Sequence, residues 1–117
     1  MLDMLTDDVA HHVNEGQVRV GKDRFAQFCA HMNDSYRETL TDVVILSSAE
    51  GTRAAAEYVV NGTYLKTDAG LVQARGQSAC LPEGSLFDIR IGHHGCGARI
   101  CGVTTYDNLA DWTAQVT

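Results

Sequence analysis

The sequence predicts an α+β fold in which one amphipathic helix packs on one face of a curved antiparallel sheet. Two observations predict it: a single apolar stripe of helical period near the N-terminus, and a series of alternating, turn-bounded segments through the rest of the chain. The order strand, helix, then several strands favours a sheet with its helices on one side. With 117 residues, the chain is expected to form one domain, residues 1–117, around one core.

The first two elements are a short strand over residues 9–14 and a helix over residues 22–37. The helix is predicted because apolar side chains recur at positions i, i+3, i+4, i+7 and i+11. These side chains form one stripe that consists of Phe25, Phe28, Cys29, Met32 and Tyr36. A stripe of this width indicates that the helix packs on a large apolar surface.

The remainder of the chain alternates between strand-forming segments and turns. Strands are predicted over residues 41–48, 52–66, 84–91 and 98–106. The first of these ends at the turn AEGT, and the last two are joined by a glycine-rich segment. The amphipathic segment NLADWTAQV, residues 108–116, closes the chain and is expected to press its apolar side chains onto one end of the sheet.

Charge and hydropathy exclude several classes of function. Nine Lys and Arg residues oppose fifteen Asp and Glu residues, and the basic residues are scattered singly, so nucleic acid is not an expected partner. No segment approaches the roughly 18 consecutive apolar residues that a membrane span requires. The opening MLDMLTDDV lacks the basic region and apolar run of an export signal, so we expect a cytoplasmic protein with free thiols.

The segment IGHHGCGARIC, residues 91–101, concentrates potential metal ligands at the turn between the last two strands. Structural zinc sites favour spacings such as C-x2-C, in which two ligands converge on one ion. Here His93 and His94 are adjacent and would point apart on an extended chain, while Cys96 and Cys101 would have to meet across the hairpin. We therefore expect a solvated hairpin tip, rich in glycine because the turn requires positive φ angles, and no metal site. A metal-binding hairpin is the alternative.

Candidate chemistry lies on the first strand. Side chains alternate along a strand, so His12 and Asn14 share one face while His11 and Val13 share the other. If the first face is directed towards the helix, an imidazole and a carboxamide lie together in an apolar cavity. Such a pair can accept a proton and hold a polar ligand atom. The alternative is a polar strand end with both histidines at its rim.

The long strand over residues 52–66 offers a possible cavity wall. Tyr58 and Tyr64 lie on one face with alanine, valine and glycine residues, so their hydroxyls could bind a ligand inside the cavity. The alternative is that both tyrosines pack in the core with their hydroxyls at the surface. The opposite face carries Glu57 and Asn61 among apolar residues, which suits either a solvated surface or a homodimer interface.

Several segments, in order, resemble the SnoaL-like and ketosteroid isomerase-related proteins of the nuclear transport factor 2-like superfamily. They are LTDDVAHHVNEGQVRVGKDRFAQF, GTRAAAEYVVNGTYLKTDAGL, LPEGSLFDIRIG and VTTYDNLADW, and together they span nearly the whole chain. The resemblance implies a cone, in which a strongly curved antiparallel sheet packs on helices and leaves a ligand pocket at its mouth. Such relatives carry a first helix before LTDDV, which this chain is expected to lack, so a partner must supply the lid or the pocket stays open.

The resemblance also suggests a role for the first strand. His12 falls at about the place where ketosteroid isomerases keep their general-base carboxylate. In limonene epoxide hydrolases, a Tyr-x-Asn pair on the same strand orients the attacking water, and the matching residues here are His12 and Asn14. The resemblance therefore implies that His12 is the base and that Asn14 orients a ligand.

Other parts of these two catalytic sites are not matched. The Arg-x-Asp pair of the hydrolases falls on Tyr58 and Val60, and the aspartate of their last strand falls near Thr105. The oxyanion-hole aspartate of the isomerases falls near Ser85. Epoxide hydrolysis and steroid isomerisation are therefore not expected.

We therefore expect a protein that binds a small hydrophobic molecule in the cone, without a cofactor, as an isomerase, cyclase or hydrolase with His12 as base. The expected site consists of His12 and Asn14 as catalytic residues and Tyr58, Tyr64, Thr105, Phe28 and Met32 as ligand-binding residues, with Asp107 as a weaker candidate near the mouth. The alternative is a non-catalytic, dimeric module that binds a ligand in the cone or a protein on the outer face of the sheet. Relatives pair through that outer face, so a homodimer is expected.

Overall fold

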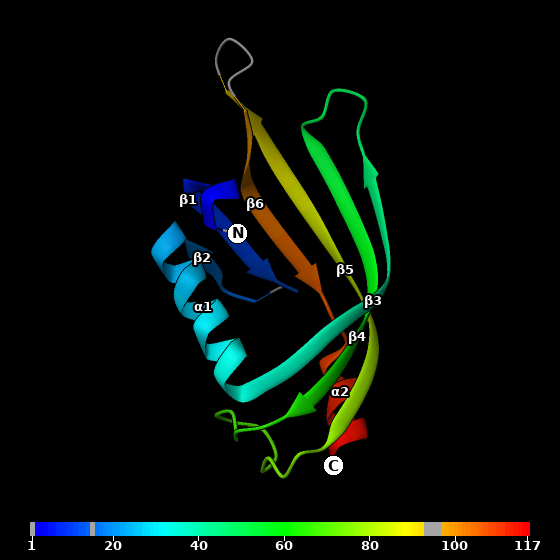
Figure 1. The fold of residues 1–117 in the computed structure, drawn as a ribbon. Coiled ribbons are helices and arrows are strands. Elements are labelled where there is room, and N and C mark those ends of the chain that lie inside the picture. Colours follow the sequence, from blue (N-terminus) through cyan, green and yellow to red (C-terminus); the bar gives the residue numbers. More distant parts are fainter. Residues whose placement is uncertain (1, 15, 93–96) are drawn as a thin grey trace.

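The computed structural model of the protein describes residues 2–14, 16–92 and 97–117. The α+β prediction is confirmed, with the elements arranged as Figure 1 shows. In chain order they are η1 (Leu2–Met4, a 3-10 helix), β1 (Leu5–Val13), β2 (Val18–Val20), α1 (Lys22–Ser35), β3 (Tyr36–Ser47), β4 (Arg53–Tyr64), β5 (Ser78–Ile91), β6 (Ala98–Tyr106) and α2 (Leu109–Val116). In the described residues, only η1 precedes β1.

The six strands form one open sheet in the order β2-β1-β6-β5-β4-β3. The long strands bend across the molecule, and α1 lies beside β1 and β2. Helix α2 packs against the first residues of β5 (Figure 1). Neighbouring strands are antiparallel except for β1 and β6, which are parallel, with His11 opposite Val103. The prediction of a wholly antiparallel sheet is therefore wrong at this pair, and the sheet is mixed.

The predicted boundaries differ from the structure at the starts of β1 and β5, which begin at Leu5 and Ser78, and between α1 and β3. The helix ends at Ser35, because Tyr36 adopts the extended conformation (φ −135°, ψ 143°) and begins β3. Strand β3 therefore starts five residues before the predicted residue 41 and places Tyr36 opposite Tyr64 on β4. Strand β2 was not predicted, because its three residues are too few to show alternation.

The register of the strands assigns each side chain to one of two faces of the sheet. On the inner face, which α1 covers, neighbouring strands place Val9, Val103 and Phe87 together. The apolar core there consists of Leu5, Val9 and Val103, packed with Phe25, Phe87 and Ile100. A second packed group lies near the C-terminus, where the rings of Tyr36, Tyr64 and Trp112 contact one another.

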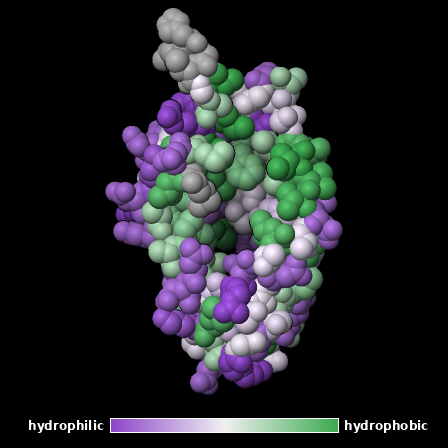
Figure 2. All heavy atoms as spheres, viewed as in Figure 1, coloured by the Kyte–Doolittle hydropathy of each residue, from purple (hydrophilic) through white to green (hydrophobic). Residues whose placement is uncertain are grey.

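The outer face, opposite to α1, carries exposed apolar side chains that we call the outer apolar patch: Val44, Leu46, Leu86 and Tyr106. Apolar residues gather along β3 in the view of Figure 2, which also shows a hollow between α1 and β3.

Within the described residues, neither helix is long and apolar enough to cross a membrane.

Candidate functional site

The hollow beside α1 leads into a pocket of about 270 Å³ that we take as the candidate site. Its walls come from the end of β1, the inner side of α1, β3, β5, the loop after β4, and α2. The apolar lining consists of Val13, Phe28, Met32, Tyr36, Leu71, Leu81, Leu109 and Trp112, and the polar lining consists of Asn14, Glu38, Asp68, Glu83, Asp107 and Asn108. An apolar cavity with a few grouped polar side chains is typical of small-molecule sites.

Asn14 and Asp107 form one rim of the pocket. The Asn14 side-chain Nδ2 donates to Asp107 Oδ1 at 2.6 Å, and the Asp107 backbone N–H donates to Asn14 Oδ1 at 2.9 Å. Asn14 has a φ of 51°, in the left-handed region that asparagine tolerates better than most other residues. This backbone conformation ends β1 and lets its side chain reach the residue that follows β6.

Two carboxyl groups of the pocket, Glu83 and Glu38, have raised pKa values, mainly through desolvation and in part through the charge of Asp107. Desolvation is the main cause that raises the pKa of Glu83 to about 7, and the negative charges of Asp107 and Glu38 raise it further. Glu38 as a residue is exposed, yet the partial burial of its carboxyl group, together with the charge of Asp107, raises its pKa as well. Glu83 is therefore poised to exchange a proton near neutral pH.

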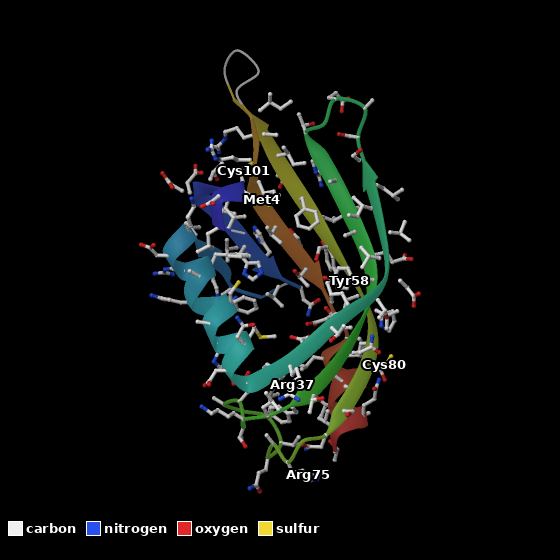
Figure 3. The ribbon with its side chains drawn as sticks, in the orientation of Figure 1. Met4, Arg37, Tyr58, Arg75, Cys80 and Cys101 are labelled. Atoms are coloured by element: carbon white, nitrogen blue, oxygen red, sulfur yellow. The ribbon has the colours of Figure 1, made fainter. Side chains whose placement is uncertain are left out.

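Hydroxyl groups line the sheet next to these carboxyl groups. Tyr58, which lies in the middle of the sheet (Figure 3), has its hydroxyl 2.7 Å from Ser85 Oγ, and Ser85 Oγ lies 3.4 Å from Thr105 Oγ1. Tyr58 is opposite Glu83 in the β4–β5 register. Desolvation raises the pKa of Tyr58, as do the nearby carboxylates led by Glu83, so this phenol stays protonated and can donate a hydrogen bond.

The opposite rim is a second hydrogen-bonded group centred on Asp68, in the loop after β4. The Tyr36 hydroxyl donates to Asp68 Oδ2 at 2.7 Å, and His31 Nε2 lies 3.0 Å from Asp68 Oδ1. The Asp68 backbone N–H donates to the Tyr64 hydroxyl at 2.8 Å, and that hydroxyl donates to the Val72 carbonyl oxygen at 2.8 Å. Asp68 thus fixes the loop over this side of the pocket.

The structure reverses the expected orientation of the two adjacent histidines. His11, not His12, faces α1: its ring is buried and contacts the rings of Phe25 and Phe28 at centroid distances of 5.0 and 4.7 Å. His12 is paired with Thr104, in the row that continues to Leu86 on the outer face. His12 and Asn14 were expected to lie together in the cavity only if their face of β1 is directed towards α1. This condition is not met, because Asn14 lines the pocket and His12 does not.

The remaining predicted residues divide between the pocket and its surroundings. Phe28 and Met32 line the pocket from α1. Tyr58 and Thr105 belong to the set of side-chain hydroxyls next to the pocket and are not part of its lining. Tyr64 is almost fully buried and packs in the core, as the alternative expected, but its hydroxyl is hydrogen-bonded to the loop after β4 and is not at the surface.

A metal site receives no support from the residues that the structure describes. In residues 2–14, 16–92 and 97–117, His, Cys, Asp and Glu side chains form no group of three or more with a geometry suited to a metal ion. The tip of this hairpin, residues 93–96, which was predicted to be solvated with metal binding as the alternative, lies outside the described residues. Gly97, at its end, has the positive φ (66°) that the turn was expected to require.

Comparison with known proteins shows the family of the chain. Residues 1–93 match the model of the SnoaL-like domain. The chain belongs to the SnoaL-like family. A structure from Silicibacter sp. TM1040, described as a putative polyketide cyclase, is 60% identical with a TM-score of 0.91, covering 100% of this chain and 81% of the other. One from Xanthomonas campestris pv. campestris with the same description is 50% identical with a TM-score of 0.89, covering 100% and 82%.

The fold of this SnoaL-like protein extends to more distant structures. An NTF2-like protein from Burkholderia xenovorans LB400 is 9% identical with a TM-score of 0.69, covering 99% of this chain and 80% of the other, which shows a shared fold alone. The predicted resemblance to SnoaL-like proteins is therefore confirmed at the level of the family, and the predicted α+β cone of the nuclear transport factor 2-like kind is confirmed as a fold. A search of curated proteins gave no match.

Sequence reasoning missed Glu38 and Glu83 as pocket residues. Glu38 was hidden because residues 36–40 were not predicted as a strand, so no face could be assigned to its side chain. Glu83 precedes the predicted strand over residues 84–91, although β5 begins at Ser78. A signal was present, since Leu81, Glu83 and Ser85 occupy alternate positions, but a proline such as Pro82 is disfavoured inside a strand.

Proposed function

We propose that this SnoaL-like protein is a cofactor-free acid–base enzyme that cyclises a small polyketide-like molecule, with Glu83 as the base. The observation that carries the proposal is a carboxyl group with a pKa of about 7 inside a largely apolar pocket. The description of two relatives, 60% and 50% identical, as putative polyketide cyclases supports this reaction class.

In the proposed step, the Glu83 carboxylate removes a proton from a carbon next to a carbonyl group. The electron pair of the broken C–H bond forms a new C–C bond to a second carbonyl carbon of the same molecule. The protonated Glu83 then returns its proton to the resulting alkoxide, so the step needs neither an oxidant nor a reductant. General acid–base catalysis is most efficient when the pKa of the group lies near the working pH, as it does for Glu83.

The neighbours of Glu83 support this role by position. Asp107, held by Asn14, and Glu38 are the negative charges that keep the Glu83 pKa high. Phe28, Met32 and Trp112 supply an apolar surface that would position the carbon skeleton.

The charged residues of the lining restrict the charge that the reacting part of the substrate can carry. Glu38, Asp68, Glu83 and Asp107 all line the pocket, and the lining contains no lysine or arginine. Carboxylates repel an anionic group most strongly where water is partly excluded. The portion of the substrate inside the pocket is therefore proposed to be neutral and mostly apolar.

His12 as the base stays a prediction, and the geometry favours Glu83 over it. His12 starts from the face of β1 opposite to the core, and it does not line the pocket. If Glu83 is the base, substitution of Glu83 abolishes proton abstraction. If His12 is the base, substitution of His12 does so, and a comparison of the two variants decides between them.

The test is the exchange of α-protons for deuterium in ketone and 1,3-diketone probes, followed by NMR. We expect Glu83→Gln to lower the enzyme-dependent exchange rate by about 10²–10⁴-fold. His12→Ala and the outer-face control Glu57→Gln should leave the rate within about twofold of the wild-type protein. Retention of the rate by Glu83→Gln, or its loss in His12→Ala, would overturn the assignment of Glu83.

A second candidate function is binding of a small molecule without turnover, in a dimeric module. The outer apolar patch favours the dimer, because Leu46 is 67% exposed and Val44 51% exposed on a strand at the edge of the sheet. A groove of about 790 Å³ on the same face is lined in part by Ala55, Val59 and Leu86. We propose that a second copy of the chain covers this face. Glu83, Asp107 and Asn108 line both the groove and the pocket, so the second copy would lie next to the candidate site. Thermal shift with lipophilic ligands, in the absence of any α-proton exchange, would favour binding without turnover.

A further inference from the structure

A second concavity, of about 440 Å³, lies between β2 and α1 and has a different character from the pocket. We call it the β2–α1 groove, and its main lining residues are Gln17, Arg19, Arg24, Gln27, Phe28 and His31. Phe28 also lines the pocket, so one ring borders both cavities. The pocket contains carboxyl groups and no arginine or lysine, whereas the groove lining contains two arginines and no carboxylate.

The polar side chains of the groove, which include the guanidinium groups of Arg19 and Arg24, come from two elements that face each other. Arg24, Gln27 and His31 recur at i, i+3 and i+7 on α1, which places them along one side of the helix. Arg19 comes from the centre of β2 and completes the lining from the other side. The groove therefore gathers positive charge in a chain whose net charge is −6.

Arg19 lies over the ring of Phe28. It is half-buried, and its guanidinium carbon lies 4.9 Å from the centre of the Phe28 ring. Stacking on an aromatic ring fixes a guanidinium group while leaving its N–H groups free to bind oxygen atoms. Among the described residues, neither Arg19 nor Arg24 forms an ion pair, whereas Lys22, Lys66 and Arg90 each pair with an aspartate.

We propose that the β2–α1 groove binds a phosphate group carried by the ligand whose neutral, apolar end occupies the pocket. A phosphate offers several oxygen atoms to the two guanidinium groups, and arginine binds such oxygens in a fixed, bidentate geometry. The proposal rests on the proposed function for the identity of the pocket as the ligand site, and it adds an anionic handle outside that pocket. Two neighbouring sites of opposite charge would then fix the direction in which the ligand enters.

The test uses naphthyloxyhexyl phosphate, naphthyloxyhexanol and inorganic phosphate as probes, with affinities measured by calorimetry at low salt. The phosphate ester should bind roughly tenfold or more tightly than the alcohol, a difference of about 1.4 kcal/mol in binding free energy. The advantage should fall towards unity in Arg19→Gln and in the exposed variant Arg24→Gln. The control Arg75→Gln, on the loop after β4 at the far end of the molecule (Figure 3), should keep it.

Each alternative result has a defined meaning. Equal affinities for ester and alcohol, or an advantage that persists in both groove variants, would overturn the proposal. If inorganic phosphate binds as tightly as the ester, the groove is a site for free phosphate, and the proposal that it binds the phosphate group of the pocket ligand is overturned. Circular dichroism checks that Arg19→Gln is folded, and Arg24→Gln tests the groove independently. The measured quantity is affinity, which does not depend on turnover. If the wild-type protein binds the phosphate ester more tightly than the alcohol but exchanges no α-protons, the proposed enzymatic function is contradicted and the proposed phosphate site is not.

Discussion

Asn14 and Asp107 bind each other through two hydrogen bonds, at 2.6 and 2.9 Å, although 93 positions separate them in the sequence. The contact joins the end of β1 to the segment between β6 and α2. It holds the Asp107 carboxylate at the rim of the pocket, where its charge raises the pKa of Glu83. A single amide side chain therefore links the backbone geometry of β1 to the acid–base chemistry proposed for β5.

Two replacements of Asn14 distinguish the stability contributed by its side-chain hydrogen bonds from the stability cost of its backbone conformation. Asn14→Gly removes both side-chain bonds but accepts the φ of 51° without strain, and we expect a loss of about 1 kcal/mol in the free energy of unfolding. Asn14→Ala removes the same bonds and adds a left-handed alanine, which costs roughly a further 1–2 kcal/mol. Urea denaturation of both variants measures the difference. Equal stability of the glycine and alanine variants would show that this backbone conformation relaxes.

Asp107→Asn should move the pH dependence of proton abstraction. Glu83 acts as a base only when deprotonated, so the exchange rate is expected to rise with pH through a midpoint near 7. Removal of the Asp107 charge makes deprotonation of Glu83 easier, and the midpoint should shift to lower pH. The measurement is the exchange rate between pH 5 and pH 9, with Asp88→Asn on the outer face as the control. An unchanged midpoint would mean that Asp107 does not act on Glu83.

The fold was largely predictable because its strongest signals are local. The helical stripe from Phe25 to Met32 and the alternation along β4 each follow from side-chain burial, which has a fixed period in sequence. The boundary at Tyr36 was not predictable, because Tyr36 continues the apolar stripe of α1 while stacking on Tyr64 across the sheet. There, a long-range contact outweighs the local preference for helix.

The site was less predictable because it depends on which face of each strand is buried. Periodicity separates His11 from His12 but does not say which one faces α1. The answer comes from the parallel pairing of β1 with β6, which sets His11 beside Val103 in the core. The raised pKa of Glu83 likewise depends on neighbours from β3 and from the end of β6, which no local pattern brings together.

Glu83 should also make the stability of the protein depend on pH. Its pKa is 4.5 in the reference state and about 7 in the folded protein, so the folded state holds more protons between these values. Its contribution to stability is therefore complete below pH 4.5 and is lost as the pH rises through about 7. Glu83→Gln should gain stability relative to the wild-type protein at pH 8, and thermal unfolding at pH 5 and pH 8 tests this. A gain of equal size at both values would argue for packing and against titration.

The outer apolar patch predicts the effect of charge on self-association. Leu46 is 67% exposed in the monomer, so Leu46→Lys should leave the fold intact. If a second copy covers this face, burial of the added charge is unfavourable and the dimer should dissociate at least about tenfold more readily. Sedimentation velocity measures the association, with Met4→Lys, at an exposed position on η1, as the control. A wild-type protein that is monomeric at high concentration would exclude the proposed dimer.

His11 should destabilise the protein in mild acid. Its ring is 3% exposed between Phe25 and Phe28, and its Nδ1 has no hydrogen-bond partner in the part of the chain that the structure describes, so protonation would place a charge in an apolar environment. Desolvation is the main cause that lowers its pKa, and the charge of Arg19 adds to the effect. The unfolded state then binds more protons than the folded state below the ordinary pKa of 6.5, and stability falls as the pH drops through the lowered folded value. His11→Leu removes this titration and should flatten the loss of stability between pH 7 and pH 5, whereas the exposed control His31→Gln should retain it. Urea unfolding across this range measures the slopes, and equal slopes for His11→Leu and the wild-type protein would mean that His11 is not the titrating group.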